Sequence, residues 1–123
     1  MAPRTPCANI NSEKRALKMR KSSLTIEATR SGSTTVVAAS GTLDIATTEE
    51  FETAVQHALS DGTDVVVDLS DLNLCDSTGL GAMVRLHRRA EASDASLTLR
   101  RPQRAVAEVL AMTGIDKVIA TEH

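Results

Sequence analysis

The sequence predicts a single α/β domain, in which a mixed β-sheet packs against crossover helices in the order β-β-α-β-α-β-α-β. Two kinds of segment alternate along the chain. In one, apolar residues alternate with polar ones or form a continuous run, which is typical of strands; in the other, apolar residues recur every three to four positions, which is typical of helices. Strands that alternate with helices after the first pair indicate parallel pairing through crossover connections. A chain of 123 residues allows one domain with one modest core.

The first two strands are predicted as an antiparallel pair. Residues 24–28 alternate apolar and polar side chains, residues 34–39 are rich in small and β-branched ones, and Gly32 supplies the turn between them. The run Gly-Thr-Leu-Asp at residues 41–44 then closes the second strand. Two interpretations of Asp44 stay open: it prepares the start of the next helix, or it lies near a partner surface.

A first helix is predicted over residues 46–59, because apolar residues recur at i+3, i+4, i+7 and i+8 from Phe51. Thr47 or Thr48 is placed to cap it. Residues 65–69 follow as a nearly continuous apolar run, which is typical of a strand covered by helices on both faces.

The remaining elements continue the same alternation. A second helix runs from Leu80 onward, and residues 97–99 predict the fourth strand. Pro102 suits the first turn of a third helix, which Gly114 ends. Residues 118–119 predict a short last strand.

Charge is distributed unevenly along the chain. Residues 1–22 carry six Lys or Arg side chains and one Glu, whereas residues 23–123 carry 8 basic and 15 acidic ones. We therefore expect a basic, flexible tail over residues 1–22, which either has no further role or touches an acidic partner or lipid, followed by the domain at residues 23–123. An acidic domain with Phe51 as its only aromatic residue argues against nucleic acid as its partner.

Cysteine usage and hydropathy indicate the compartment. The two cysteines, Cys7 and Cys75, are too few for a disulfide framework, and we interpret both as free thiols in a reducing environment. No apolar run approaches the ~18 residues of a membrane span, and the chain start lacks a secretory pattern. The sequence therefore predicts a cytoplasmic protein without membrane association.

The candidate functional stretch is Leu-Asn-Leu-Cys-Asp-Ser-Thr-Gly-Leu at residues 72–80, between the apolar strand and the second helix. It combines a carboxylate at Asp76, adjacent hydroxyls at Ser77 and Thr78, and a glycine at Gly79. Free backbone N–H groups and the positive end of the helix dipole converge at a helix start and tolerate an added phosphate. The stretch therefore suits a reversible charge switch, although such residues are also ordinary helix caps.

Three runs carry a resemblance to a known family: Asp-Ser-Thr-Gly-Leu-Gly at residues 76–81, Gly-Thr-Leu-Asp at residues 41–44 and Leu-Ala-Met-Thr-Gly-Ile at residues 110–115. Over residues 24–119 the chain resembles the STAS domain of anti-sigma-factor antagonists, which implies a STAS-like fold. The resemblance also implies that Ser77 is phosphorylated by a partner kinase, while Thr78 matches a neighbouring hydroxyl that is not the usual acceptor.

The sequence departs from the family pattern in two places. Members usually continue into a C-terminal helix, whereas this chain stops at His123. Cys75 stands where the family more often has a bulky side chain.

The function implied by the resemblance is a binding module without enzymatic activity or a cofactor. Unphosphorylated, it would sequester a serine-kinase anti-sigma factor that uses ATP and magnesium; phosphorylation of Ser77 would release that partner, and a phosphatase would reset the switch. The domain would be a monomer or weak dimer. The predicted partner-binding residues are Asp44, Asp76, Ser77, Thr78, Gly79, Leu80 and Arg85.

Two other functions stay open at this point. The segment from Asp71 to Asp76, together with Asp68, could hold a metal ion in a small phosphotransfer or nucleotide-binding protein. Alternatively, Ser77 merely caps a helix in a constitutive structural module. Arg85, with its helix neighbours at positions 88 and 89, forms either a solvated face or a contact for an acidic partner. The histidines lack metal-ligand spacing, so the sequence predicts no catalytic or metal residues.

Overall fold

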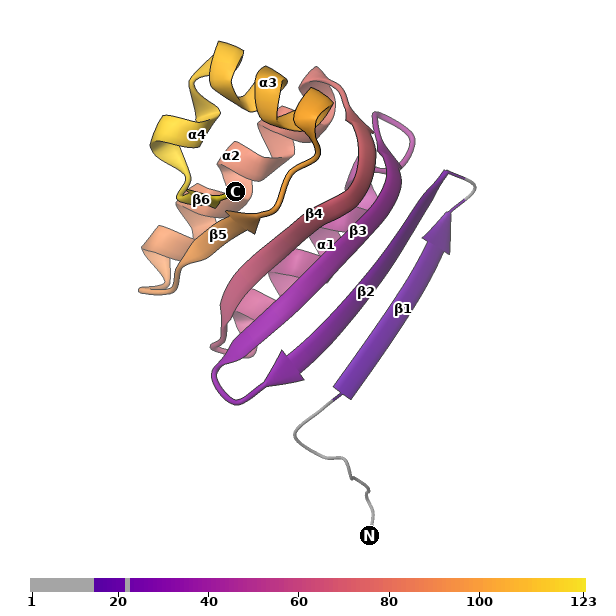
Figure 1. Ribbon diagram of the computed structural model, residues 1–123. Coiled ribbons are helices and arrows are strands. Elements are labelled where there is room, and N and C mark those ends of the chain that lie inside the picture. The colour runs from indigo at the N-terminus through magenta and orange to yellow at the C-terminus, as the bar shows by residue number, and fades with distance from the viewer. Residues whose placement is uncertain (1–14, 22) are drawn as a thin grey trace, which may run out of the picture.

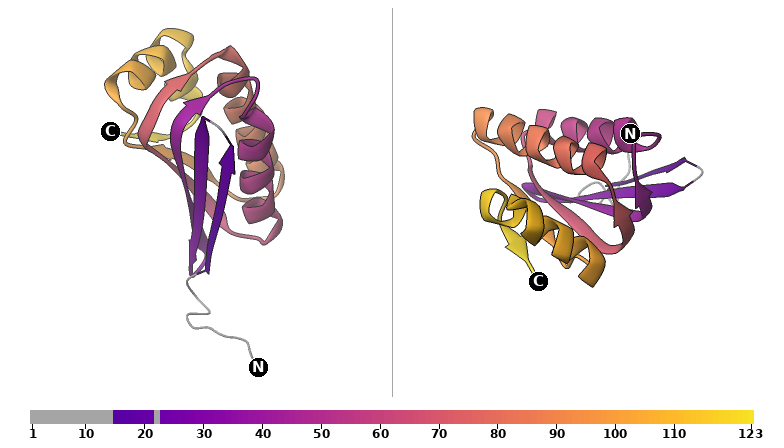
Figure 2. Two further views of the ribbon diagram at one scale, coloured as in Figure 1. Left: turned by 90° about the vertical axis from the view of Figure 1, so that its right-hand side faces the viewer. Right: turned by 90° about the horizontal axis from the view of Figure 1, so that it is seen from above.

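The computed structural model describes residues 15–21 and 23–123 as a six-stranded mixed sheet between two helical layers. Helices α1 and α2 cover one face of the sheet, and α3 and α4 lie against the other (Figures 1 and 2). The α/β class and the mixed sheet predicted from the sequence are confirmed. The elements are β1 (Arg15–Lys21), β2 (Leu24–Ser31), β3 (Thr34–Leu43), α1 (Thr48–Ser60), β4 (Asp64–Cys75), α2 (Ser77–Ala92), β5 (Leu97–Arg100), α3 (Arg104–Thr113), α4 (Ile115–Val118) and β6 (Thr121–Glu122).

Strand order in the sheet follows chain order, from β1 to β6. The first three strands form an antiparallel meander, while β3, β4, β5 and β6 run parallel, joined by crossovers through the helices. The carboxyl ends of β3 and β4 therefore meet at one edge, where Leu43 pairs with Cys75. This edge carries the turns before α1 and α2.

Strand β1 corrects the predicted domain boundary. Arg15–Lys21 pairs antiparallel with β2, in register from Arg15 opposite Arg30 to Lys21 opposite Leu24. A basic composition does not prevent edge pairing, since backbone groups make the ladder and charged residues are common on edge strands. The flexible tail predicted for residues 1–22 is therefore wrong for this segment, and its other residues lie outside the described part of the chain.

The end of the chain differs from the prediction in a second way. Residues 118–119 were expected as a strand, but Val118 ends the short helix α4 and the sheet pairing begins at Thr121. Gly114, at a φ of 78°, ends α3 as expected and redirects the chain into α4. Ile119 is fully buried and takes extended backbone angles, so its apolar character serves the core rather than the strand ladder.

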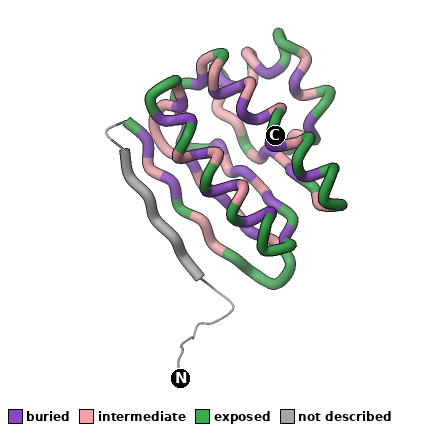
Figure 3. Tube along the Cα trace, turned by 180° about the vertical axis from the view of Figure 1, so that it is seen from behind, coloured by how far each residue is buried: buried purple, intermediate pink, exposed green. Residues whose placement is uncertain are grey.

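A single aliphatic core fills the space between the sheet and both helical layers. Phe51 is fully buried on α1, as its helical spacing predicts, and the inward faces of β3 and β4 supply small and branched side chains. Buried and exposed residues alternate along the helices (Figure 3), and the buried apolar residues of α1, α2 and α3 belong to the core cluster. Within the described residues, no helix is both long and apolar enough to cross a bilayer.

Gly41 lies near the end of β3, opposite Leu24 of β2. Its φ is 107°, and an added Cβ would lie 2.2 Å from the Ser23 carbonyl oxygen, which already accepts a hydrogen bond from the Thr42 N–H at 2.8 Å. Only glycine fits this close approach without strain. The turn role predicted for this glycine is wrong, because β3 continues through Gly41 to Leu43, and a register shift in its pairing with β4 falls between Gly41 and Thr42.

We predict that Gly41→Ala lowers the free energy of unfolding by about 3 kcal/mol, because it combines a left-handed residue with a backbone clash. Gly32→Ala is the matched control: Gly32 also has a positive φ, of 62°, but nothing lies within 4 Å of its added Cβ. It should cost only about 1–2 kcal/mol. Urea unfolding monitored by circular dichroism provides the measurement, because a chain without Trp or Tyr lacks the usual fluorescence signal. Equal losses for the two variants would contradict the clash.

Candidate functional site: the turn between β4 and α2

Parallel pairing of β3 and β4 positions the candidate stretch. Strand β4 extends to Cys75, beyond the predicted residues 65–69, and keeps its pairing with β3 across two register shifts. The Asp76 N–H then donates to the Leu43 carbonyl oxygen at 3.1 Å, which fixes the turn against the end of β3. Helix α2 begins at Ser77, three residues before the predicted start.

Asp76 caps the helix. Its backbone is extended, with φ −91° and ψ −175°, and its Oδ1 accepts a hydrogen bond from the Gly79 N–H at 3.1 Å. The carboxylate therefore satisfies a free helix N–H and places negative charge at the positive end of the dipole. The alternative in which Ser77 is the cap is wrong, because Asp76 fills that position.

Ser77 is the first residue of α2 and is exposed. Within the described residues its hydroxyl makes no hydrogen bond, since the capping contact belongs to Asp76. This hydroxyl is therefore accessible from solvent and does not stabilise the helix start.

Gly79 and Leu80 lie in the interior, which differs from the direct partner contact that the sequence predicted for them. A Cβ on Gly79 would lie 2.8 Å from Leu43 Cγ and 2.9 Å from Cys75 Sγ. The glycine thus lets α2 begin directly against the ends of both parallel strands. Leu80 is buried in the core. Gly79 and Leu80 therefore hold the start of α2 against the core, and the turn that contains Ser77 stays at the surface.

Asp44 organises the neighbouring turn, between β3 and α1. Its Oδ1 accepts hydrogen bonds from the Ala46 N–H at 3.0 Å and the Thr47 hydroxyl at 3.1 Å, and its carbonyl accepts from the Thr48 hydroxyl at 2.6 Å. Preparation of the helix start, one of its two interpretations, is confirmed. Thr47 stands at the N-cap position, but its hydroxyl serves this turn rather than a helix N–H.

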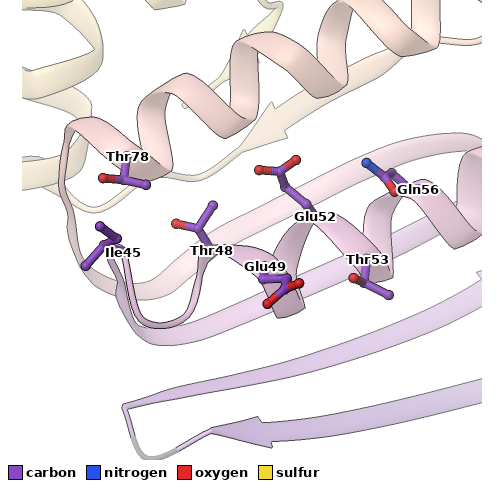
Figure 4. Close-up of a pocket in the computed structure, with 7 residues that line it drawn as sticks. All are labelled: Ile45, Thr48, Glu49, Glu52, Thr53, Gln56 and Thr78. Atoms are coloured by element: carbon purple, nitrogen blue, oxygen red, sulfur yellow. The ribbon is translucent and has the colours of Figure 1, made fainter.

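A shallow pocket lies beside the turn, between α1 and the first turn of α2 (Figure 4). Thr78 reaches it from α2, Ile45 from the loop before α1, and Glu52 points from α1 toward α2. Sequence reasoning found Thr78 but missed the other residues, because helical periodicity cannot show which polar face meets another element. The lining consists of Ile45, Thr48, Glu49, Glu52, Thr53, Gln56 and Thr78.

Arg85 is not part of the pocket lining, but it is paired with Glu52, which is. Its Nη2 donates to Glu52 Oε1 across α1 and α2. An added Cβ at Gly81 would lie 3.4 Å from Arg85 Nη1, which is ordinary van der Waals contact. The arginines at positions 88 and 89 are exposed. Arg85 therefore joins two helices, which sequence spacing did not predict.

Comparisons with known proteins agree with this geometry. The family model described as "Mlab, STAS domain" matches residues 26–120. The chain belongs to the STAS domain family. The resemblance inferred from residues 24–119 is thereby confirmed. No curated protein matches the sequence significantly.

Solved structures share the fold of this STAS domain. An anti-sigma factor antagonist from Mycobacterium paratuberculosis has 23% identity and a TM-score of 0.74, covering 81% of this chain and 86% of that one. The anti-sigma factor antagonist SpoIIAA in its unphosphorylated form has 19% identity and a TM-score of 0.63, covering 87% of each chain. Phosphorylated SpoIIAA, a Bacillus cell fate determinant, has 17% identity and a TM-score of 0.58, covering 87% of this chain and 90% of that one.

The metal-site alternative finds no geometric support in the STAS domain. In the described part of the chain, no three His, Cys, Asp or Glu side chains lie close enough to hold a metal ion. Asp76 is occupied as the helix cap. Burial opposes ionisation of Asp68, but hydrogen bonds from the Ser70 N–H and hydroxyl and from Arg100 outweigh it and lower the pKa of Asp68. That carboxylate is thus held by protein groups.

Cys75 lies directly under the turn as a free, buried thiol. Burial raises the pKa of Cys75 to about 12, and the neighbouring Asp76 carboxylate adds to the shift. The thiolate is the reactive form of cysteine, so the folded domain keeps this thiol inert. The other cysteine predicted to be free, Cys7, lies outside the described residues.

We predict that removing the cap destabilises the STAS domain and that removing the serine hydroxyl does not. Asp76→Ala should lower the free energy of unfolding by about 0.5–2 kcal/mol, whereas Ser77→Ala should change it by less than about 0.5 kcal/mol. Urea unfolding of both variants provides the measurement. If Ser77→Ala lowered the free energy of unfolding as much as Asp76→Ala does, Ser77 would contribute to the helix cap and the prediction would be wrong.

We also predict that Cys75 resists alkylation while the domain is folded. In a Cys7→Ser background at pH 8, iodoacetamide should label the native protein far more slowly than the urea-unfolded protein, because burial and the raised pKa both suppress the thiolate. Mass spectrometry over time gives both rates. Equally fast labelling of the native protein would show that the turn opens readily.

Proposed function

We propose that this STAS domain is an anti-sigma-factor antagonist, a binding module switched by phosphorylation of Ser77. In the unphosphorylated state it binds a serine-kinase anti-sigma factor, which then releases its sigma factor. The kinase phosphorylates Ser77 with ATP and magnesium, the complex dissociates, and a phosphatase restores the hydroxyl. The domain is the substrate and ligand of these proteins rather than an enzyme, and it works in the cytoplasm, where its partners and ATP are found.

The observation that carries the proposal is the free hydroxyl of Ser77 at the first residue of α2. Because Asp76 caps the helix, modification of Ser77 breaks no hydrogen bond of the described structure. The hydroxyl is exposed, so a kinase can reach it without opening the fold. These are the properties expected of a phosphoacceptor that leaves the domain folded.

The surroundings favour Ser77 over the adjacent hydroxyl. Thr78 is only partly exposed and lines the pocket that also contains Glu49 and Glu52. A phosphate on Thr78 would be added close to these carboxylates, and like charges repel. Ser77 lies outside the pocket lining, which supports the assignment that the family resemblance implies.

A simple charge argument accounts for the switch. Phosphate adds a charge of about −1.5 to −2 at neutral pH, and the positive end of α2 stabilises such a charge by about 0.3–1 kcal/mol. Across an interface, the same charge placed against acidic or apolar surface costs several kcal/mol, and Asp76 beside it strengthens the repulsion. Since about 1.4 kcal/mol is tenfold in affinity, the complex dissociates without any change in the backbone.

The solved forms of SpoIIAA support this argument. That protein has been solved in both its unphosphorylated and its phosphorylated form, and each form shares its fold with this chain. In SpoIIAA, therefore, the fold persists when the protein is phosphorylated.

We predict that Ser77 becomes phosphorylated when the purified domain is incubated with ATP, magnesium and cytosolic extract of its native organism. Mass spectrometric site mapping should find the phosphate on Ser77 in the wild-type protein and in Thr78→Ala, and none in Ser77→Ala. An extract that phosphorylates another substrate but leaves Ser77 unmodified would contradict the proposal.

Binding to the kinase purified by this activity then tests the switch itself. Ser77→Ala should bind it with wild-type affinity, and Ser77→Asp should bind at least tenfold more weakly, because it places a permanent charge at the helix start. Isothermal titration calorimetry measures both affinities. Equal binding by the two variants would show that charge at this position does not control the complex.

A further inference from the structure

Arg85 uses only one nitrogen of its guanidinium in the described structure. Its Nη2 donates to Glu52 Oε1 of α1, whereas its Nη1 and Nε form no hydrogen bond with any described residue. The Arg85 side chain is 58% exposed. Because a guanidinium carries five N–H donors in one plane, Arg85 keeps donors free for a second acceptor.

The free nitrogen Nη1 lies back along α2, on the side of Ser77. It is 3.4 Å from the position that a Cβ on Gly81 would occupy, and Gly81 is one helical turn before Arg85. Long helical side chains lean toward the helix N-terminus, so this direction is the usual one. Gly81 is also one turn after Ser77, and helix residues four apart are neighbours, with about 5–6 Å between their Cβ atoms. The guanidinium of Arg85 therefore takes the place of an i+4 partner of Ser77, and Gly81 has no side chain to separate the two.

The surroundings of Ser77 otherwise carry negative charge. Residues 31–84 contain no Lys or Arg, so Arg85 is the first such side chain of α2. Asp76 lies directly before Ser77, and two glutamates line the pocket beside the turn. A phosphate with a charge of about −1.5 to −2 at this position would meet like charges unless a cation approached it. Arg85 is the cation that α2 itself supplies.

The other arginines of α2 and β5 are less well placed. Those at positions 88 and 89 are exposed but lie about one turn farther from Ser77. Arg100 and Arg101, at the end of β5, already pair with the Asp68 carboxylate at 3.4 Å and 3.9 Å. Only Arg85 among them combines free donors with a position one turn from Ser77.

We propose that Arg85 binds the phosphate of phosphorylated Ser77 through Nη1, while Nη2 stays on Glu52. This inference rests on the proposed function, because it concerns the modified form of the same serine. Hydrogen bonds between a guanidinium and a phosphate are charge-assisted and strong. Glu52 holds the guanidinium in place beforehand, so little entropy is lost when the phosphate is added. Since Glu52 also offsets the charge of Arg85, the phosphorylated turn keeps a net negative charge, as the switch requires.

The test uses protein in which phosphoserine is placed at position 77 during synthesis by genetic code expansion, so it needs no kinase. Phosphorus NMR during a pH titration gives the second pKa of this phosphate, which is ordinarily about 6. A cation in contact favours the doubly charged phosphate, so Arg85→Gln should raise this pKa by about 0.5–1 unit. Arg85→Lys keeps the charge but loses the planar guanidinium, and its pKa should lie between the two.

Arg89→Gln is the matched control, because it removes the same charge from the same face of α2, one turn farther from Ser77. At about 150 mM salt it should change the pKa of the phosphate by less than about 0.2 unit, because screening weakens charge interactions beyond about 8 Å. Circular dichroism of each variant checks that the domain stays folded.

The outcomes separate this inference from the proposed function. An unchanged pKa in folded Arg85→Gln would overturn the Arg85 contact, whether or not a kinase modifies Ser77. Equal shifts in Arg85→Gln and Arg89→Gln would overturn it too, because they would reflect only the overall charge of the helix. Failure of the cytosolic extract to phosphorylate Ser77 would instead contradict the proposed function, and it is observed in a different experiment.

Discussion

The hydrogen bond from the Asp76 N–H to the Leu43 carbonyl oxygen joins the ends of two parallel strands, and the candidate site depends on it. Parallel pairing brings the carboxyl ends of β3 and β4 to one edge of the sheet, so the turns before α1 and α2 become neighbours. Residues about 30 positions apart, Ile45 and Thr78, consequently line one pocket. The bare Cα of Gly79 against Leu43 and Cys75 keeps α2 close enough to maintain this arrangement.

Three residues of the Asp-Ser-Thr-Gly-Leu run have separate structural roles. Asp76 supplies the cap, Gly79 the close approach and Leu80 the attachment to the core, which leaves Ser77 without a structural role. A residue whose side chain can be changed at little cost to folding is well suited to reversible modification. Within this turn, the side chains that stabilise the fold are therefore different from the one that we propose to be phosphorylated.

Sequence reasoning recovered what depends on local pattern. The buried face containing Phe51 followed from helical periodicity, and the end of α3 at Gly114 followed from the backbone conformation that glycine permits. It failed where a distant neighbour decides the outcome. Arg15–Lys21 pairs because the edge of β2 is available, Gly79 is required by Leu43, and the Arg85–Glu52 pair joins helices separated by a strand. None of these three contacts leaves a periodic signal.

The same distinction explains why the pocket beside Ser77 was not foreseen. Glu49 and Glu52 resemble ordinary residues of a solvated helix face, and in an isolated α1 they would be no more than that. Packing of α2 against α1 gives them different surroundings. Glu52 forms an ion pair with Arg85, whereas Glu49 lines the same pocket as the exposed Ile45. The pocket that joins Ile45, Glu49 and Thr78 arises only because both parallel strands place the starts of their helices at the same edge. The composition of this pocket is therefore a property of the sheet topology as much as of the short motif.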